Sequence, residues 1–174
     1  MTSSKKNFLI TGLPGVGKTT LVRNLTVALK TLHPVGFYTS EIREGGVRKG
    51  FELVTFNGGR RLFSHVDIKS PFRVGKYGVN IAAFEDCLDL IDYSNPAAKV
   101  IVIDEIGKME CLSEKFKNLI QEILDSDRFV IATIAARGSG IIADIKQRQD
   151  IRLFEITPQN RDSLVPLILT LFRK

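Results

Sequence analysis

Short apolar runs alternate with amphipathic segments along most of the chain. Residues 7–11 form an apolar run that leads into a glycine-rich turn, which predicts a buried parallel strand. Residues 18–32 carry leucine and valine at helical spacing, and His33-Pro34 predicts the end of that helix, because the residue before proline avoids the α region. Strand, turn and helix in this order predict the start of an α/β unit.

The same alternation returns in the second half of the chain. Further strands are expected at 100–103, 129–134 and 152–156, and further helices at 82–92, 113–125, 141–148 and 160–172. Strands that alternate with helices predict a mostly parallel sheet with helices on its faces. The chain contains no repeat, low-complexity tract or linker, so we expect residues 1–174 to form a single domain.

Residues 35–80 follow a different pattern. Apolar and aromatic runs are separated here by the glycine pairs Gly45-Gly46 and Gly58-Gly59, which are typical of hairpin turns. We expect two or three antiparallel strands, with a hairpin at about 37–66 that is added to the parallel sheet.

The composition is that of a globular protein, with 44% hydrophobic and 25% charged residues among 174. No apolar run reaches the roughly 18 residues that span a bilayer. The N-terminal segment MTSSKKNFLITG has only a short apolar stretch, unlike a secretory signal. Cys87 and Cys111 lie far apart, as expected of free thiols in a reducing compartment. We therefore expect a soluble cytoplasmic protein without a membrane partner; the sequence does not specify its oligomeric state, and a monomer is the default expectation.

The net charge of +6 is concentrated in one segment. Residues 41–76 hold eight basic residues (Arg43, Arg48, Lys49, Arg60, Arg61, Lys69, Arg73 and Lys76) and four acidic ones (Glu41, Glu44, Glu52 and Asp67). A surface of this charge would attract an anionic ligand such as a nucleotide or RNA. A solvated basic hairpin is the alternative explanation.

The turn after the first strand, GLPGVGKT at 12–19, matches the phosphate-binding pattern G-x-x-x-x-G-K-[ST] in full. Its glycines let the backbone amides point at phosphate oxygens, Lys18 would reach the β- and γ-phosphates, and the Thr19 hydroxyl would bind Mg²⁺. An accidental glycine-rich loop is the alternative, and the flanking strand and helix argue against it. The predicted nucleotide-binding residues of this loop are Gly12, Leu13, Pro14, Gly15, Val16, Gly17, Lys18, Thr19 and Thr20.

Two adjacent acids, Asp104 and Glu105, follow the apolar run at 100–103. In a Mg-nucleotide site, Asp104 would hold the Mg²⁺ together with Thr19, with a water molecule between the carboxylate and the ion. Glu105 would orient and polarise a water molecule for in-line attack on the γ-phosphate. A purely structural acid pair is the alternative, but two desolvated acids without a cation are costly.

An acid beside the metal-binding aspartate resembles the catalytic-glutamate division of P-loop proteins. In that division another strand lies between the strand of the phosphate loop and the strand of the acids. Residues 129–134 are the natural candidate, which gives the strand order 5-1-4-3-2 in a three-layer sandwich. Thr133 would then lie at a strand tip and contact the γ-phosphate or the attacking water; an ordinary β-branched strand residue is the alternative.

Arg137 and Arg161 follow the last two predicted strands. Either arginine would neutralise charge in the transition state or stack on the base, with solvent exposure as the alternative. The chain contains no N-K-x-D segment, which reads guanine in regulatory GTPases, so we expect loose base selectivity.

Several longer segments resemble the cancer-related nucleoside-triphosphatase family, which comprises small P-loop enzymes of archaea, thermophilic bacteria and animals. These segments are GLPGVGKTT, GFYTSEIREGGVRKGFELVTF, RVGKYGVN, VIVIDEIGKME and ITPQNRDSLVP. The resemblance implies Mg²⁺-dependent hydrolysis of ATP, GTP, CTP and UTP to the diphosphate and phosphate. It also implies that a second segment lines the nucleotide site, made of Val100, Ile101, Val102, Ile103, Asp104, Glu105, Ile106 and Gly107. Lys108 and Glu110 complete the signature without an implied role, and Arg137 falls in a loop that varies in the family.

Two other functions stay open from the sequence. A nucleotide or nucleoside kinase would share the size and topology, but it would need an acceptor pocket and an arginine-bearing lid. An ATP-switched RNA-binding or RNA-modifying factor would use the basic segment, although stacking aromatic signatures are missing. Glu105 favours water as the acceptor, and therefore hydrolysis.

Overall fold

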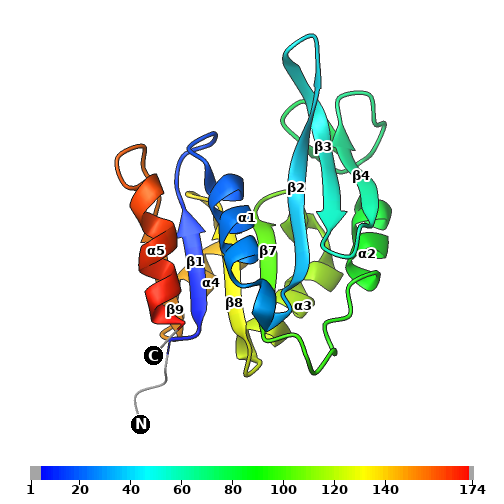
Figure 1. The fold of residues 1–174 in the computed structure, drawn as a ribbon. Coiled ribbons are helices and arrows are strands. Elements are labelled where there is room, and N and C mark those ends of the chain that lie inside the picture. The colour runs from blue at the N-terminus through cyan, green and yellow to red at the C-terminus, as the bar shows by residue number, and fades with distance from the viewer. Residues whose placement is uncertain (1–4, 173–174) are drawn as a thin grey trace.

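The computed structural model describes residues 5–172, and within them nine strands form one sheet (Figure 1). The first four residues of the N-terminal segment, which we expect not to be a secretory signal, lie outside this range. The strands are β1 (Asn7–Thr11), β2 (Val35–Glu44), β3 (Val47–Thr55), β4 (Arg60–His65), β5 (Arg73–Val74), β6 (Tyr77–Val79), β7 (Val100–Ile106), β8 (Phe129–Ile134) and β9 (Ile151–Glu155). The helices are α1 (Lys18–Ala28), α2 (Ile81–Asp89), α3 (Glu114–Asp125), α4 (Ile141–Gln147) and α5 (Arg161–Leu171), with 3₁₀ turns η1 (Lys30–Leu32) and η2 (Glu110–Leu112).

The parallel half of the sheet has the strand order β9-β1-β8-β7-β2. In the numbering of the predicted strands this is 5-1-4-3-2, so the predicted order is confirmed. The central strands are apolar and buried on both faces, as a sheet covered by helices on both sides requires. Strand β8 lies between β1 and β7 and thereby separates the phosphate loop from the two acids by one strand.

Helices cover both faces of the sheet and produce three layers. Leu9 of β1 belongs to a buried cluster formed with α2, α3 and α4, whereas its neighbour Ile10 belongs to a second cluster formed with α1 and α5. This division follows from the strand geometry, since successive side chains point to opposite faces. Figure 1 shows α1 and α5 in front of the sheet, with α3 and α4 behind it. The predicted three-layer sandwich is therefore confirmed.

The observed elements differ from the predicted ones mainly at their ends. The helix predicted at 18–32 is divided, because α1 stops at Ala28 and the separate 3₁₀ turn η1 follows. The strand predicted at 100–103 was too short, since β7 continues through both acids to Ile106, which pairs with Ile134 of β8. The apolar run ends before Asp104, which predicts an early end of the strand, but the backbone pairing continues past Asp104 and Glu105.

The antiparallel part of the sheet is larger than predicted. The part of β2 that pairs with β3, together with β3 and β4, corresponds to the predicted hairpin region. Figure 1 shows β2 and β3 extending beyond the parallel strands. Strands β5 and β6 continue the sheet and were not predicted. They contain two and three residues around a turn at Gly75, which is too short for a recognisable alternation. We refer to β3–β6, together with residues 38–44 of β2 that lie beyond its pairing with β7, as the antiparallel extension.

Within residues 5–172, none of the helices has the length and apolar character needed to cross a membrane.

Candidate functional site

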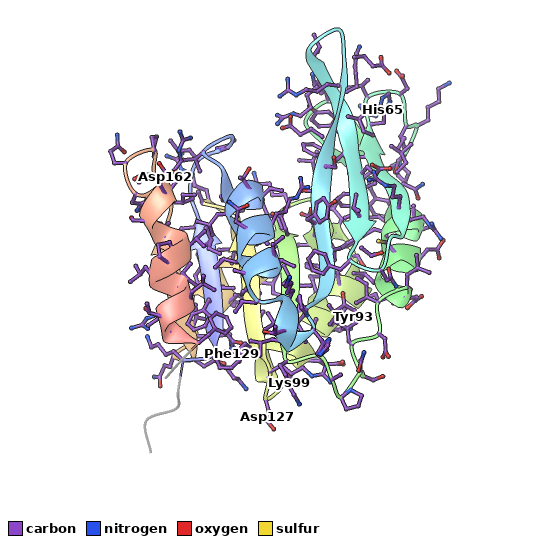
Figure 2. All side chains as sticks on the ribbon, in the orientation of Figure 1. His65, Tyr93, Lys99, Asp127, Phe129 and Asp162 are labelled. Carbon is purple, nitrogen blue, oxygen red and sulfur yellow. The ribbon has the colours of Figure 1, made fainter. Side chains whose placement is uncertain are left out.

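The phosphate-binding motif occupies the loop between β1 and α1, at the carboxyl end of the parallel strands. Figure 2 labels Lys99, Asp127 and Phe129 at the opposite end of the sheet, where β7 and β8 begin. The loop turns into α1 at Gly17, whose φ of 109° is a left-handed conformation that glycine adopts without strain. No acidic residue lies in the first turn of α1, so its positive end is available to an anion.

Lys18 is held directly over this loop. Its ammonium group donates hydrogen bonds to the carbonyl oxygens of Gly12, at 2.9 Å, and Leu13, at 3.1 Å. These contacts keep the positive charge at the mouth of the loop, close to the amides that would surround a phosphate. The loop therefore has the geometry and charge of an anion-binding site.

Asp104 is the central acceptor of the site and is almost fully buried, at 1% exposure. The hydroxyl of Thr19 donates to its Oδ2 at 2.8 Å, and the hydroxyl of Thr133 donates to its Oδ1 at 2.6 Å. The Thr39 amide adds a longer contact of 3.4 Å to Oδ2. Burial raises the pKa of Asp104, whereas these hydrogen bonds and the charge of Lys18 oppose the rise. A cation nearby would favour the charged carboxylate.

Thr19 and Asp104 fit a magnesium site by their chemistry. Both supply oxygen atoms, and their side chains already lie within hydrogen-bond distance of each other. Among the described residues, no cluster of three or more histidine, cysteine, aspartate or glutamate side chains is placed to hold a metal.

Glu105 follows Asp104 in β7, across a cis peptide bond, and its side chain is partly exposed. Burial raises the pKa of Glu105; the charge of Lys18 opposes this effect and that of Asp104 adds to it. A carboxylate with a raised pKa is a stronger base than an ordinary glutamate. Glu105 also lines the cavity above the phosphate loop, where a reacting group would lie.

A cavity of about 720 Å³ lies above the loop, and many predicted residues line it. These are Gly12, Leu13, Pro14, Gly15, Gly17, Lys18, Thr19, Thr20, Glu105 and Arg137. We call it the phosphate cavity. Its position next to α1 and the end of β7 brings together the two segments that the sequence analysis singled out.

Other predicted residues do not line this cavity. Val100, Ile101, Val102, Ile103 and Ile106 are buried in the apolar core around β7, and Val16 packs against the cluster under α1. Thr133 and Asp104 are buried, and Asp104 accepts hydrogen bonds from the hydroxyl groups of Thr19 and Thr133. Gly107 lies beside the carboxyl group of Glu105. Arg161 begins α5; Figure 2 labels its neighbour Asp162 at the outer edge of the molecule.

The antiparallel extension and β2 supply cavity residues that the sequence analysis did not identify. Thr39, Ser40, Glu41, Arg48 and Phe51 line the phosphate cavity, as do Arg23, Ala135 and Ala136. The first five belong to the segment GFYTSEIREGGVRKGF. The resemblance of this segment to the family was the one feature of the sequence that could have indicated a place in the site. Only the fold shows that this segment reaches the phosphate loop.

Part of the basic charge of this segment is neutralised by ion pairs. Arg43 and Arg48 both pair with Glu41, at 2.7 and 2.9 Å, and Arg60 pairs with Glu52 at 2.6 Å. The Arg48 guanidinium also donates to the Tyr77 hydroxyl at 3.1 Å. The surface is therefore less uniformly positive than the residue count suggests.

Comparisons with known proteins agree with this geometry. A family model described as NTPase matches residues 7–169. The nucleoside-triphosphatase THEP1 of Thermotoga sp. (strain RQ2) is 42% identical over 166 residues, which cover 95% of this chain and 94% of that protein. The crystal structure of THEP1 from Aquifex aeolicus is 38% identical, with a TM-score of 0.86 over 97% of this chain and 99% of the other.

The solution structure of a human cancer-related nucleoside triphosphatase is also similar, with 36% identity and a TM-score of 0.79 over 95% of this chain and 96% of that one. Fold and sequence thus agree along nearly the whole length. The chain therefore belongs to the NTPase family that includes THEP1 and the cancer-related nucleoside-triphosphatases.

Proposed function

We propose that this nucleoside-triphosphatase hydrolyses Mg²⁺-bound nucleoside triphosphates to the diphosphate and phosphate, with the attacking water oriented by Glu105. The observation that carries the proposal is the placement of Lys18, Thr19 and Glu105 around one cavity, with Asp104 bonded to Thr19 at 2.8 Å. Hydrolysis of nucleoside triphosphates is also supported by the names of the similar proteins.

Each residue has a separate task in this proposal. The loop amides and Lys18 bind and orient the β- and γ-phosphates, and the end of α1 adds its dipole. Thr19 and Asp104 would together hold a magnesium ion, which would supply positive charge to the phosphates. Glu105 accepts a hydrogen bond from the attacking water and thereby aligns it with the γ-phosphorus.

Thr133 is a positioning residue in this proposal and does not touch the substrate. Its hydroxyl is buried and donates to Asp104, so it fixes the orientation of the carboxylate. Arg137 lines the phosphate cavity, where it would face charge that develops on the γ-phosphate. Arg161 does not line that cavity and has no part in the proposed mechanism.

Broad base tolerance forms part of the proposal. The chain lacks the N-K-x-D segment that would select guanine, which supports this tolerance. ATP, GTP, CTP and UTP would then all serve as substrates. We also propose that the chain works as one domain, because a single sheet carries the loop, both acids and the antiparallel extension.

The test is phosphate release from each of the four triphosphates with Mg²⁺ and with a chelator. We expect release from all four, dependent on the metal, and a loss of release in Glu105→Gln with nucleotide binding retained. Release limited to one base would contradict the broad tolerance. Undiminished release by Glu105→Gln would remove Glu105 from the mechanism.

A further inference from the structure

A second cavity, of about 280 Å³, opens beside Glu105. It shares Thr39, Phe51, Glu105, Ala135 and Arg137 with the phosphate cavity, but no residue of the phosphate loop lines it. Glu105 therefore lies where the two cavities meet. We call this second space the acceptor cavity.

The walls of the acceptor cavity are largely apolar and aromatic. Phe51, Phe63, Val74 and Met109 line it, and they come from three strands and from the segment that follows β7. Phe63 is fixed in the core at 1% exposure, while the Phe51 ring packs against Tyr77 with a centroid distance of 5.5 Å. Flat phenyl groups and an adaptable thioether are suited to a planar ring.

A second carboxyl group faces this apolar space. Glu110 is 6% exposed and lines the acceptor cavity together with Glu105. Both carboxyl groups converge on Gly107: a β-carbon placed there would lie 2.7 Å from Glu105 Oε1 and 2.9 Å from Glu110 Oε2. A side chain at position 107 would therefore displace at least one of these carboxyl groups.

Two carboxyl groups at one end of an apolar cavity define the chemistry of a ligand. Carboxyl oxygens accept hydrogen bonds from hydroxyl groups, and a buried acid needs such partners. The Glu105 carboxylate would repel a phosphate group placed beside it, which favours a neutral, hydroxyl-bearing ligand over a nucleotide. Lys108 and Arg137 also line the cavity with exposed side chains, and Arg137 lines the phosphate cavity as well.

We propose that the acceptor cavity binds a nucleoside and that the enzyme transfers the γ-phosphoryl group to the primary hydroxyl of this nucleoside. The base would lie against Phe51 and Phe63, and the sugar hydroxyls would bond to Glu105 and Glu110. This proposal rests on the proposed function, because it uses the same phosphate site and the same Glu105.

The transfer step balances without a further reactant. The oxygen of the primary hydroxyl forms the new bond to the γ-phosphorus, and its proton passes to the Glu105 carboxylate. The bond between the γ-phosphorus and the β,γ-bridging oxygen breaks, and the nucleoside diphosphate leaves with that oxygen. The products are a nucleoside monophosphate and a diphosphate, and water acts as the acceptor when the cavity holds no nucleoside.

The test uses γ-³²P-labelled ATP and Mg²⁺ with adenosine, guanosine, cytidine or uridine, and separates labelled phosphate from labelled nucleoside monophosphate. We expect at least one nucleoside to be phosphorylated while release of free phosphate falls. Val74→Trp should fill the acceptor cavity and lower the ratio of nucleoside monophosphate to phosphate about tenfold, which corresponds to about 1.4 kcal/mol. Val47→Trp, on the 53% exposed tip of the same extension, should leave this ratio unchanged.

Calorimetric titration of each nucleoside into the wild-type protein, saturated with a non-hydrolysable ATP analogue, decides the proposal even where Val74→Trp does not fold. We expect saturable binding of the nucleoside that is phosphorylated. Phosphate release without labelled nucleoside and without binding heat would overturn the acceptor cavity and leave the proposed function intact. Binding without transfer would overturn the transfer step, and absence of phosphate release under all conditions would overturn both proposals.

Discussion

The hydroxyl of Thr133 donates a hydrogen bond to Asp104 Oδ1 over 2.6 Å, which ties the end of β8 to the acid of β7. Thr19 donates to the other carboxylate oxygen from the first turn of α1. Both oxygens of a buried aspartate are thus held by hydroxyl groups from two different elements. This arrangement fixes the carboxylate where it would bind a metal-coordinated water, and it leads to a direct test of the role of Thr133.

Thr133→Val removes the hydroxyl while it keeps the β-branched shape. An unsatisfied buried acceptor costs about 1–3 kcal/mol, so we expect a less stable protein and a less well oriented Asp104. The Mg²⁺ concentration that gives half-maximal phosphate release should rise about tenfold, which corresponds to about 1.4 kcal/mol of weaker Mg²⁺ binding. Magnesium titrations of phosphate release measure this shift.

Thr133→Ser should restore the wild-type magnesium dependence, because it returns the hydroxyl. Thr170→Val is a matched control on the exposed side of α5 and should have no effect. If Thr133→Val is less stable than wild type but has an unchanged magnesium dependence, the hydrogen bond between Thr133 and Asp104 has a structural role only.

Glu105→Gln keeps the size of the side chain but removes the base. We expect phosphate release to fall about 10²–10⁴-fold, the range of general-base catalysis, while the affinity for Mg²⁺-nucleotide changes little. Single-turnover phosphate release and binding of a fluorescent nucleotide separate the two effects. Glu122→Gln, an exposed position on α3, is the matched control and should behave as wild type.

The pH dependence of hydrolysis should show the ionisation of Glu105. Its pKa is raised by burial above the ordinary 4.5, and only the ionised carboxylate orients water as an acceptor. The rate should therefore decrease on acidification at a pH higher than an ordinary glutamate would give. The residual activity of Glu105→Gln should lack this decrease. Rates measured between neutral pH and the limit of stability, at saturating Mg²⁺-nucleotide, decide the point.

The sequence was sufficient to predict the phosphate loop, the two acids and the order of the parallel strands. The reason is that these features are local: a glycine pattern between a strand and a helix, and an apolar run that ends in two acids. The strand order then followed from one resemblance, which placed β8 between β1 and β7. Each of these inferences needed only a short stretch of chain.

The rest of the site depends on contacts between distant segments. Thr39 and Phe51 reach the phosphate loop only because β2 pairs with β7 and β3 folds back on β2. The spacing of residues could not decide whether Thr133 contacts the substrate or is an ordinary strand residue. Its hydrogen bond to Asp104 is seen only in the structure. Nothing in the sequence marks Glu110 as a buried acid, and its burial in η2 is seen only in the structure.

The burial of Glu110 leads to a prediction about stability. Burial raises its pKa well above 4.5, and the charge of Glu105 adds to the effect. The folded protein thus retains a proton on Glu110 at pH values where the unfolded chain has released it. Between these two pKa values, stability falls as the pH rises, because the folded state binds more protons than the unfolded state. Glu110→Gln is neutral at every pH and avoids this loss.

We therefore expect nucleotide-free Glu110→Gln to melt at a higher temperature than wild type at pH 7, with a difference that shrinks toward pH 4. For a chain of this size each kcal/mol corresponds to about 2–4 °C in Tm. Glu122→Gln, exposed on α3, controls for the general effect of removing a negative charge. A difference that is constant with pH, or a less stable Glu110→Gln at pH 7, would mean that the folded protein holds Glu110 ionised by contacts that offset its burial. The variant would then lose an attractive interaction, and the two carboxyl groups beside Gly107 would both carry charge.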